Sequence, residues 1–204
     1  LALRDGALYA KRVVDDDGTV AGAADRPAAH VVIVGGTGKL GLEFCEHFAH
    51  RGAREITLVN RFGETAAVTA RLQTVRAATA AQIRVVACDL TDAAAVSTLT
   101  AQAGAADLII HAAVEYSGVE LHDITATAVD RALQAKVTGI ARVLAALPRT
   151  ENCSVLLCSS ISASVGGRGL ALYAAGNRML DAMAHQLRAE GLDCVSVQWG
   201  HWRV

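Results

Sequence analysis

From residue 31 onward, short apolar runs alternate with longer helical segments, and this alternation restricts the possible folds more than any other feature. The runs are rich in Val and Ile and apolar at consecutive positions, as expected for strands covered on both faces. They are VVIV (31–34), EITLV (55–59), IRVVAC (83–88), DLIIHAA (107–113), SVLLCS (154–159) and CVSVQW (194–199). Helical patterns lie between them, near 39–51, 64–80, 92–103, 125–147 and 171–190. The alternation predicts an α/β fold with a doubly wound parallel sheet and right-handed crossovers.

The composition supports one compact domain and speaks against several classes of protein. The 204 residues are 52% hydrophobic and 19% charged, which is enough apolar material for a core. The net charge of -1 and the aromatic content of 4%, without a basic stripe, do not favour nucleic-acid binding. No apolar run approaches the roughly 18 residues that cross a bilayer, so we expect no membrane association. The chain begins at Leu1 without a signal-peptide pattern, and we expect a piece of a longer cytoplasmic protein.

The cysteines and histidines do not predict a metal site. The five cysteines are odd in number and form no C-x-x-C pair, and three lie in apolar runs, so buried free thiols are expected. His47 and His50 share one helical face without other candidate ligands beside them in the sequence. We interpret them as solvated or packed side chains and expect no bound metal.

Residues 1–30 depart from the alternating pattern. The segment LALRDGALYAKRVV predicts a pair of strands around Asp5 and Gly6, and DDDGTVAGAADRP is a polar, glycine-bearing linker. We therefore predict a boundary near residue 30, with the main domain over 31–204.

The first strand runs directly into GGTGKLG, in which Gly35, Gly38 and Gly41 are spaced three apart. Glycines allow a tight turn and bring backbone N–H groups against a pyrophosphate, next to the positive end of the following helix. A merely tight strand-to-helix turn is the alternative. The position after a strand and before a helix favours a dinucleotide site of the Rossmann type. The predicted contacts are Gly35, Thr37, Gly38, Lys39, Leu40 and Gly41.

The ends of the second and third strands indicate which dinucleotide binds. An acidic residue after the second strand would bind a ribose 2′-hydroxyl, whereas a basic one accommodates a 2′-phosphate. The sequence has Asn60 and Arg61 there, which favours NADPH, although Arg61 is also compatible with an ordinary surface charge. After the third strand, Asp89 and Leu90 are placed to contact the adenine. The alternative role for Asp89 is a helix N-cap, which Thr91 or Asp92 could supply equally well.

Several motifs together resemble one family, the ketoreductase domains of modular polyketide synthases, within the short-chain dehydrogenase/reductases. The resemblance covers nearly the whole chain. It is carried by GGTGKLG (35–41), NR (60–61), CDLTD (88–92), HAA (111–113), AKVTG (135–139), CSS (158–160), YAAGN (173–177) and WGHW (199–202). Lys136, Ser160 and Tyr173 are separated by 24 and 13 residues, as in the family pattern.

The resemblance implies a role for each of these residues. Tyr173 would donate a proton to the reacting carbonyl, Ser160 would donate a hydrogen bond to it, and Lys136 would tune the tyrosine and bind the cofactor ribose. Asn177 would hold the proton relay, and Tyr173 would also contact the cofactor, as would His111, Ala112 and Ala113. A phenol with an ordinary pKa of about 10 is a reluctant proton donor near neutrality, and a nearby ammonium lowers that value. Taken singly, the tyrosine, serine and lysine are also compatible with a surface residue, a strand-end cap and a solvated side chain.

The sequence departs from the family pattern at three places. Val114 occupies the position of the glycine in the usual HAAG motif, which the resemblance places near the nicotinamide end of the cofactor, and the valine is expected either to crowd the site or to shift the backbone. The usual Leu-Asp-Asp signature aligns with 116–118, and the alternative tryptophan marker with Val165, so the product stereochemistry is not predicted. The resemblance also implies that the substrate lid and last strand follow the WG-x-W motif, beyond this chain, and that residues 1–30 are the tail of a preceding structural subdomain.

The resemblance implies reduction of a 3-oxoacyl thioester to a 3-hydroxyacyl thioester with NADPH. The substrate would be held by a phosphopantetheine arm on an acyl carrier protein or carrier domain, among neighbouring synthase domains. Two alternatives remain open from the residues. One is a catalytically degenerate scaffold that binds NADPH, and the other is an epimerase that acts at C2 of the same class of substrate.

Overall fold

The computed structural model describes residues 2–9, 28–114, 116 and 118–201. Residues 2–9 form a small antiparallel hairpin of β1 (Ala2–Arg4) and β2 (Ala7–Tyr9). Its two-residue turn has positive φ at Asp5 (50°) and Gly6 (74°), as the favoured hairpin turns require. The predicted strand pair is therefore confirmed. The predicted linker falls largely on 10–27, outside the described residues, so the boundary near residue 30 stays a prediction.

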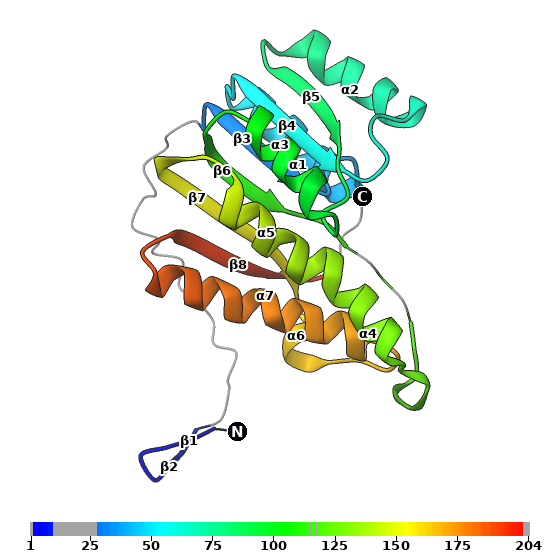
Figure 1. Ribbon diagram of the computed structural model, residues 1–204, viewed down its shortest axis with the longest axis vertical. Coiled ribbons are helices and arrows are strands. Elements are labelled where there is room, and N and C mark those ends of the chain that lie inside the picture. Colours follow the sequence, from blue (N-terminus) through cyan, green and yellow to red (C-terminus); the bar gives the residue numbers. More distant parts are fainter. Residues whose placement is uncertain (1, 10–27, 115, 117, 202–204) are drawn as a thin grey trace.

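The described main body is a six-stranded parallel sheet in the order β5-β4-β3-β6-β7-β8 (Figure 1). Its strands are β3 (His30–Val34), β4 (Glu55–Asn60), β5 (Gln82–Ala87), β6 (Ala106–His111), β7 (Arg149–Ser160) and β8 (Asp193–Trp199). All six predicted strands are confirmed. The strand order reverses between β3 and β6, and ligands of open α/β sheets bind at such a switch point, beyond the carboxyl ends of the strands.

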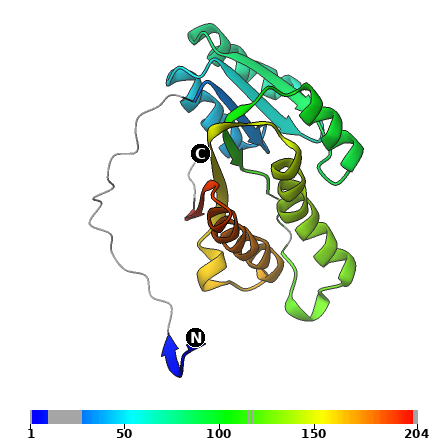
Figure 2. The same cartoon turned by 60° about the vertical axis from the view of Figure 1, so that its left-hand side comes forward.

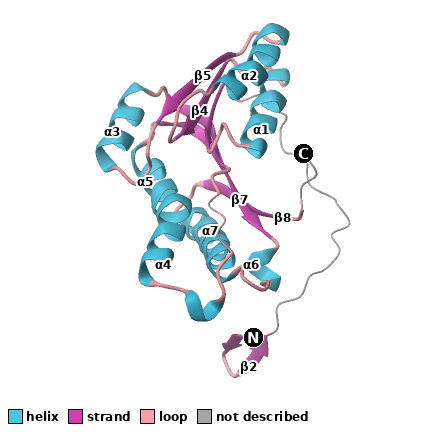
Figure 3. Ribbon diagram, turned by 90° about the vertical axis from the view of Figure 1, so that its right-hand side faces the viewer, coloured by secondary structure: helices cyan, strands magenta, loops and turns pink. Residues whose placement is uncertain are grey.

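Helices cover both faces of the sheet (Figure 3). They are α1 (Lys39–His50), α2 (Ala66–Ala78), α3 (Ala93–Gln102), α4 (Ala126–Leu133), α5 (Gly139–Ala146), α6 (Ser162–Val165) and α7 (Ala171–Ala189), with the short 3₁₀ helix η1 (Leu121–Asp123) and the π-helix η2 (Gln134–Thr138). No helix among the described residues is long and apolar enough to span a bilayer.

The apolar runs predicted as strands are explained by two cores, one on each face. In β3, Val31 and Ile33 pack with α1 and α2, whereas Val32 and Val34 pack with α3, α5 and α7. Because both faces are covered, every residue of β3 is buried and no polar alternation appears in its sequence. All five cysteines are free and buried, as predicted.

The structure differs from two sequence-based expectations. The helix predicted over 125–147 is not uniform, because a π-helical turn, η2, separates α4 from α5. Such turns are rare and occur frequently at functional sites. The segment 161–172 lies between the predicted strand run 154–159 and the helical pattern near 171–190, where no helix was predicted, and it contains the short helix α6. Figure 2 shows the helical run from α4 through η2 to α5 lying beside α7. Residues of this run and of α7 therefore approach the same end of the sheet.

Candidate active site

The glycine loop after β3 has the geometry of a close-approach turn. Gly35 has a φ of 77°, and a Cβ there would lie 2.5 Å from the backbone nitrogen of Ala113. A Cβ on Gly36, which the sequence analysis did not single out, would lie 2.8 Å from Cα of Leu58. The loop therefore requires glycine for packing against β4 and the end of β6.

The first turn of α1 presents unpaired backbone donors to the same place. Gly38 is the N-cap of α1, and no side chain caps this helix. The first N–H groups of an α-helix have no partner within the helix, so they attract an anion. Gly38 lines a cavity of about 260 Å³, here called the loop cavity. The glycine loop and the uncapped helix thus fit the pyrophosphate of a dinucleotide.

The loop cavity is lined by residues at or just after the ends of four strands, β3, β4, β5 and β6, and by residues of α4 and η2. Of the predicted contacts, Gly35, Thr37, Gly38, Asn60, Arg61, Asp89, Leu90, Ala112 and Ala113 line it. Phe62, Thr91, Arg131 and Gln134 line it as well and were missed. Arg131 and Gln134 are three apart on one helical face, but the sequence does not show which way that face points. The side chain of Phe62 is 80% exposed, with the Arg61 guanidinium 5.5 Å from its ring centroid.

Asn60 joins the glycine loop to the β4–α2 turn. Its amide nitrogen donates to the Thr37 hydroxyl, and its Oδ1 accepts from the backbone nitrogen of Gly63 at 2.6 Å and of Phe62 at 3.1 Å. These bonds fix the backbone around Arg61, whose side chain is exposed at the mouth of the loop cavity.

Asp89 lies in the loop cavity with a locally fixed carboxylate. Its Oδ1 accepts from the backbone nitrogen and the hydroxyl of Thr91, both at 2.8 Å. These bonds, with a smaller contribution from the Arg61 charge, lower the pKa of the Asp89 carboxyl. The alternative role as a helix cap does not apply, because the side chain of Asp92 caps α3 by accepting from Ala94 N at 2.8 Å.

A second cavity of about 330 Å³, here called the tyrosine cavity, adjoins the first. Gly38, Ala112, Ala113 and Val114 line both cavities. The tyrosine cavity brings together three of the predicted catalytic side chains, Lys136, Ser160 and Tyr173. Lys39 and Leu40 line it too, as do Cys158, Ser159, Trp199 and Gly200, which were not predicted. Val114 is 61% exposed and stands where the two cavities meet.

Lys136 lies in the π-helical turn η2 and is only 4% exposed. Its ammonium donates to the carbonyls of Ala113 at 3.3 Å and Cys158 at 3.4 Å, and lies 5.6 Å from the ring centroid of Tyr173. Burial lowers the pKa of this lysine to about 8. Gly176 faces the stem of this side chain, and a Cβ there would be in ordinary contact with Cδ of Lys136, at 3.4 Å.

Asn177 lies behind the tyrosine cavity rather than in its lining. It is fully buried, and its amide nitrogen donates to the backbone carbonyl of Tyr173 at 2.9 Å, one helical turn earlier. The hydroxyl of Ser159 donates to the backbone carbonyl of Asn177 at 3.2 Å, a bond that connects β7 to α7. The Asn177 Oδ1 accepts no hydrogen bond from the described residues.

Ser160 and Tyr173 approach the tyrosine cavity from different elements. Ser160 is the last residue of β7, and its hydroxyl accepts from the backbone nitrogen of Ser162 at 3.2 Å. Tyr173 lies in the first turn of α7 and is half-buried. The ring of Tyr116 contacts it edge-on, with centroids 5.7 Å apart, a contact that no sequence pattern indicated.

Two predicted cofactor contacts lie outside both cavity linings. His111 is fully buried at the end of β6, and Gly41 is buried in α1, where a Cβ would meet the carbonyl oxygen of Gly35. Gly41 therefore supports the loop by packing. Among the described residues, no cluster of three or more His, Cys, Asp or Glu side chains could hold a metal ion.

Comparison with known proteins gives a consistent result for the family and the fold. The family model for the KR domain matches residues 29–204. PlmKR1, the ketoreductase from the first module of phoslactomycin biosynthesis in Streptomyces sp. HK803, is similar with a TM-score of 0.79 and 37% identity, over 85% of this chain and 42% of that chain. A structure of A-type ketoreductases from a modular polyketide synthase gives 0.79 and 30%, over 87% of this chain and 39% of that chain.

Curated relatives are far longer than this chain. Polyketide synthase GfsA of Streptomyces halstedii is 35% identical over 208 residues, which cover 99% of this chain and 3% of the relative. Erythronolide synthase EryA3 of Saccharopolyspora erythraea is 34% identical over 207 residues, covering 99% and 6%. With its Rossmann-like sheet and the family match over almost all of the main domain, the chain belongs to the ketoreductase (KR) domain family of modular polyketide synthases, within the short-chain dehydrogenase/reductases.

Proposed function

We propose that this chain reduces a carrier-bound 3-oxoacyl thioester to a 3-hydroxyacyl thioester with NADPH. One observation carries the proposal: Lys136, Ser160 and Tyr173 line one cavity, and that cavity adjoins the glycine loop. KR domains are NAD(P)-dependent reductases, and the choice of NADPH, the thioester and the carrier go beyond that family membership. Neighbouring synthase domains and an acyl carrier partner are part of the proposal, as are a cytoplasmic location and a substrate delivered on a phosphopantetheine arm.

NADPH is favoured by the charge pattern of the loop cavity. Arg61 is exposed at its mouth, where a 2′-phosphate would be accommodated, and no carboxylate follows β4 at this position. Asp89 would accept a hydrogen bond from the adenine amine, because Thr91 keeps its carboxylate ionised and oriented. The glycine loop and the first turn of α1 would bind the pyrophosphate.

The tyrosine cavity supplies the groups that a carbonyl reduction needs. A nicotinamide cofactor, when bound, supplies the hydride that adds to the carbonyl carbon. The Ser160 hydroxyl donates a hydrogen bond to the carbonyl oxygen, and Tyr173 donates the proton that this oxygen takes up. Lys136 is largely protonated at pH 7, because its pKa is about 8, so its charge stabilises the phenolate that remains. Asn177 holds the backbone of Tyr173 and serves the proton relay from behind it.

The substitution Tyr173→Phe tests the proposal. We expect it to abolish NADPH oxidation with a 3-oxoacyl thioester, by 10³-fold or more, because no other proton donor of matched position remains. NADPH binding, measured by calorimetry, should change little. Tyr116→Phe is the matched control, since it removes a hydroxyl from the neighbouring ring but keeps the ring contact, and it should retain activity.

Measurements on the wild-type protein distinguish the reductase from the scaffold and the epimerase. If the wild-type chain binds NADPH but never oxidises it in the full-length protein, the scaffold function holds instead. Loss of deuterium from C2 without ketone reduction would indicate the epimerase. Unchanged turnover in Tyr173→Phe would refute the assignment of the proton donor.

A further inference from the structure

Arg142, on α5, contacts the loop that carries Asp89, although it lies outside both cavity linings. Its Nη1 donates to two successive backbone carbonyls, those of Leu90 at 3.0 Å and Thr91 at 2.7 Å. Hydrogen bonds from a charged donor are stronger than neutral ones, and a pair on adjacent peptides restricts the orientation of both. Arg142 therefore fixes the backbone of the turn between β5 and α3.

The close packing of α5 against Leu90 also restrains this turn. Gly139 begins α5, and a Cβ on it would lie 2.8 Å from Cβ of Leu90. Leu90 itself is buried, in the same core cluster as Ile140 of α5. The glycine permits α5 to approach the turn closely enough for the arginine three residues later to reach its carbonyls.

The bonds from Arg142 continue through Thr91 to the carboxylate in the loop cavity. Arg142 binds the Thr91 carbonyl, while the Thr91 nitrogen and hydroxyl both donate to Asp89 Oδ1. Displacing the Thr91 peptide would therefore move the two donors that orient the carboxylate. The helical run that bears Arg142 also contains Lys136, six residues earlier, so one stretch from η2 to α5 serves both cavities.

We propose that Arg142 is a positioning residue for the adenosine end of the cofactor, holding the Leu90–Thr91 backbone so that Asp89 presents its carboxylate to the adenine. This role rests on the proposed function. Arg142 touches neither cofactor nor substrate, and its substitution should affect binding of the adenosine half without affecting the chemical step.

The test uses Arg142→Met in the full-length protein, which keeps an apolar stem but removes the donors. We expect about a tenfold weaker affinity for the cofactor fragment 2′,5′-ADP by calorimetry, and a similar rise in KM for NADPH. The kcat at saturating NADPH should stay within about twofold of wild type. Turnover with reduced nicotinamide mononucleotide, which lacks the adenosine, should be unchanged. Arg142→Lys keeps a charged donor and should restore part of the affinity.

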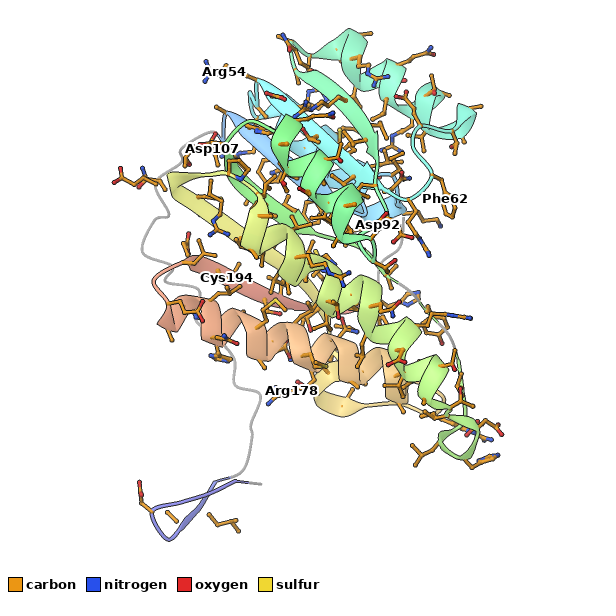
Figure 4. All side chains as sticks on the ribbon, viewed as in Figure 1. Arg54, Phe62, Asp92, Asp107, Arg178 and Cys194 are labelled. Atoms are coloured by element: carbon orange, nitrogen blue, oxygen red, sulfur yellow. The ribbon has the colours of Figure 1, made fainter. Side chains whose placement is uncertain are left out.

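Arg188→Met is the matched control. Arg188 also donates to a backbone carbonyl, that of Cys194 at 2.8 Å, near the amino end of β8. Figure 4 shows Cys194 well away from Asp92, which lies beside the Asp89 turn. This variant should lose thermal stability to a similar extent but bind 2′,5′-ADP as wild type does.

The outcomes distinguish this inference from the proposed function. If wild type binds 2′,5′-ADP and Arg142→Met binds it equally well, the positioning role is wrong and the proposed function stands. Equal losses for 2′,5′-ADP and for the mononucleotide would also overturn it, because they indicate a general structural defect. If wild type binds neither NADPH nor 2′,5′-ADP, the proposed function fails and this inference fails with it.

Discussion

The two adjoining cavities of this domain are built in opposite ways. The loop cavity presents exposed charged side chains: Arg61 is exposed, and the Asp89 carboxylate is oriented by its near neighbour Thr91. The tyrosine cavity depends on a buried ammonium, Lys136, which lies on η2 and binds the backbone carbonyl of Cys158 on β7, 22 residues later in the sequence. Exposed charged groups keep their hydration and change the free energy of unfolding little, whereas a buried charge destabilises the fold unless it is well paired. We therefore expect that exposed side chains of the loop cavity, such as Arg61, can be replaced with little loss of stability, whereas the buried charge of the tyrosine cavity lowers the stability of the domain.

Among the substitutions that test this difference between the two cavities, Lys136→Met should have the largest effect. Activity should fall by 10²-fold or more, because the phenolate loses its stabilising charge, while the free energy of unfolding at pH 7 should rise by up to about 3 kcal/mol. Below its unfolded pKa of about 10.5 but above the folded value of about 8, the lysine is protonated only when unfolded. The wild-type domain should therefore gain stability between pH 8 and 10.5, without cofactor, and the variant should not.

Urea unfolding across this pH range measures the difference between the two proteins. Lys39→Met is the control, because Lys39 lines the same cavity but is exposed, and its loss should leave the wild-type pH dependence intact. If Lys136→Met were less stable than wild type at pH 7, the proposed cost of burying this charge would be wrong.

Arg61→Gln should have the next largest effect, and on affinity alone. We expect the Kd for NADPH to rise by about 10- to 100-fold, since a charged hydrogen bond to the 2′-phosphate is lost. Affinity for NADH serves as the internal control and should change less than threefold. The melting temperature should stay within about 1 °C of wild type, because surface substitutions have small effects on stability. An equal loss of affinity for NADPH and NADH would show that Arg61 does not bind the 2′-phosphate.

A pair of glycine substitutions gives the smallest and sharpest contrast. Gly139→Ala should destabilise the domain by about 1–3 kcal/mol, because the new methyl group lies 2.8 Å from Cβ of Leu90, which cannot rotate away. Gly176→Ala should stabilise it by about 0.5–1 kcal/mol, since alanine favours the helix and meets Lys136 only at 3.4 Å. Urea unfolding of both variants checks the two signs. A destabilised Gly176→Ala would show that this glycine is needed for the lysine side chain.

The sequence predicted the features that depend on residues close together in the chain. Alternating apolar runs predicted the sheet, because strands covered on both faces cannot be polar at every second position. The glycine loop was recognisable because it joins a strand to a helix within seven residues. Tyr173 and Asn177 are one helical turn apart, and their contact follows from the helical repeat.

Only the tertiary structure decided how distant elements meet. No local pattern predicts the π-helical turn that carries Lys136, the burial that lowers its pKa to about 8, or the carbonyls of Ala113 and Cys158 that it binds. The contact of Arg142 with the Leu90 and Thr91 carbonyls, about fifty residues away, is likewise invisible in the sequence. The sequence by itself determined the strands, the loop and the kinds of chemical group present. The tertiary structure decided which groups lose water and which face each other, because desolvation and long-range contacts arise only when the whole sheet is assembled.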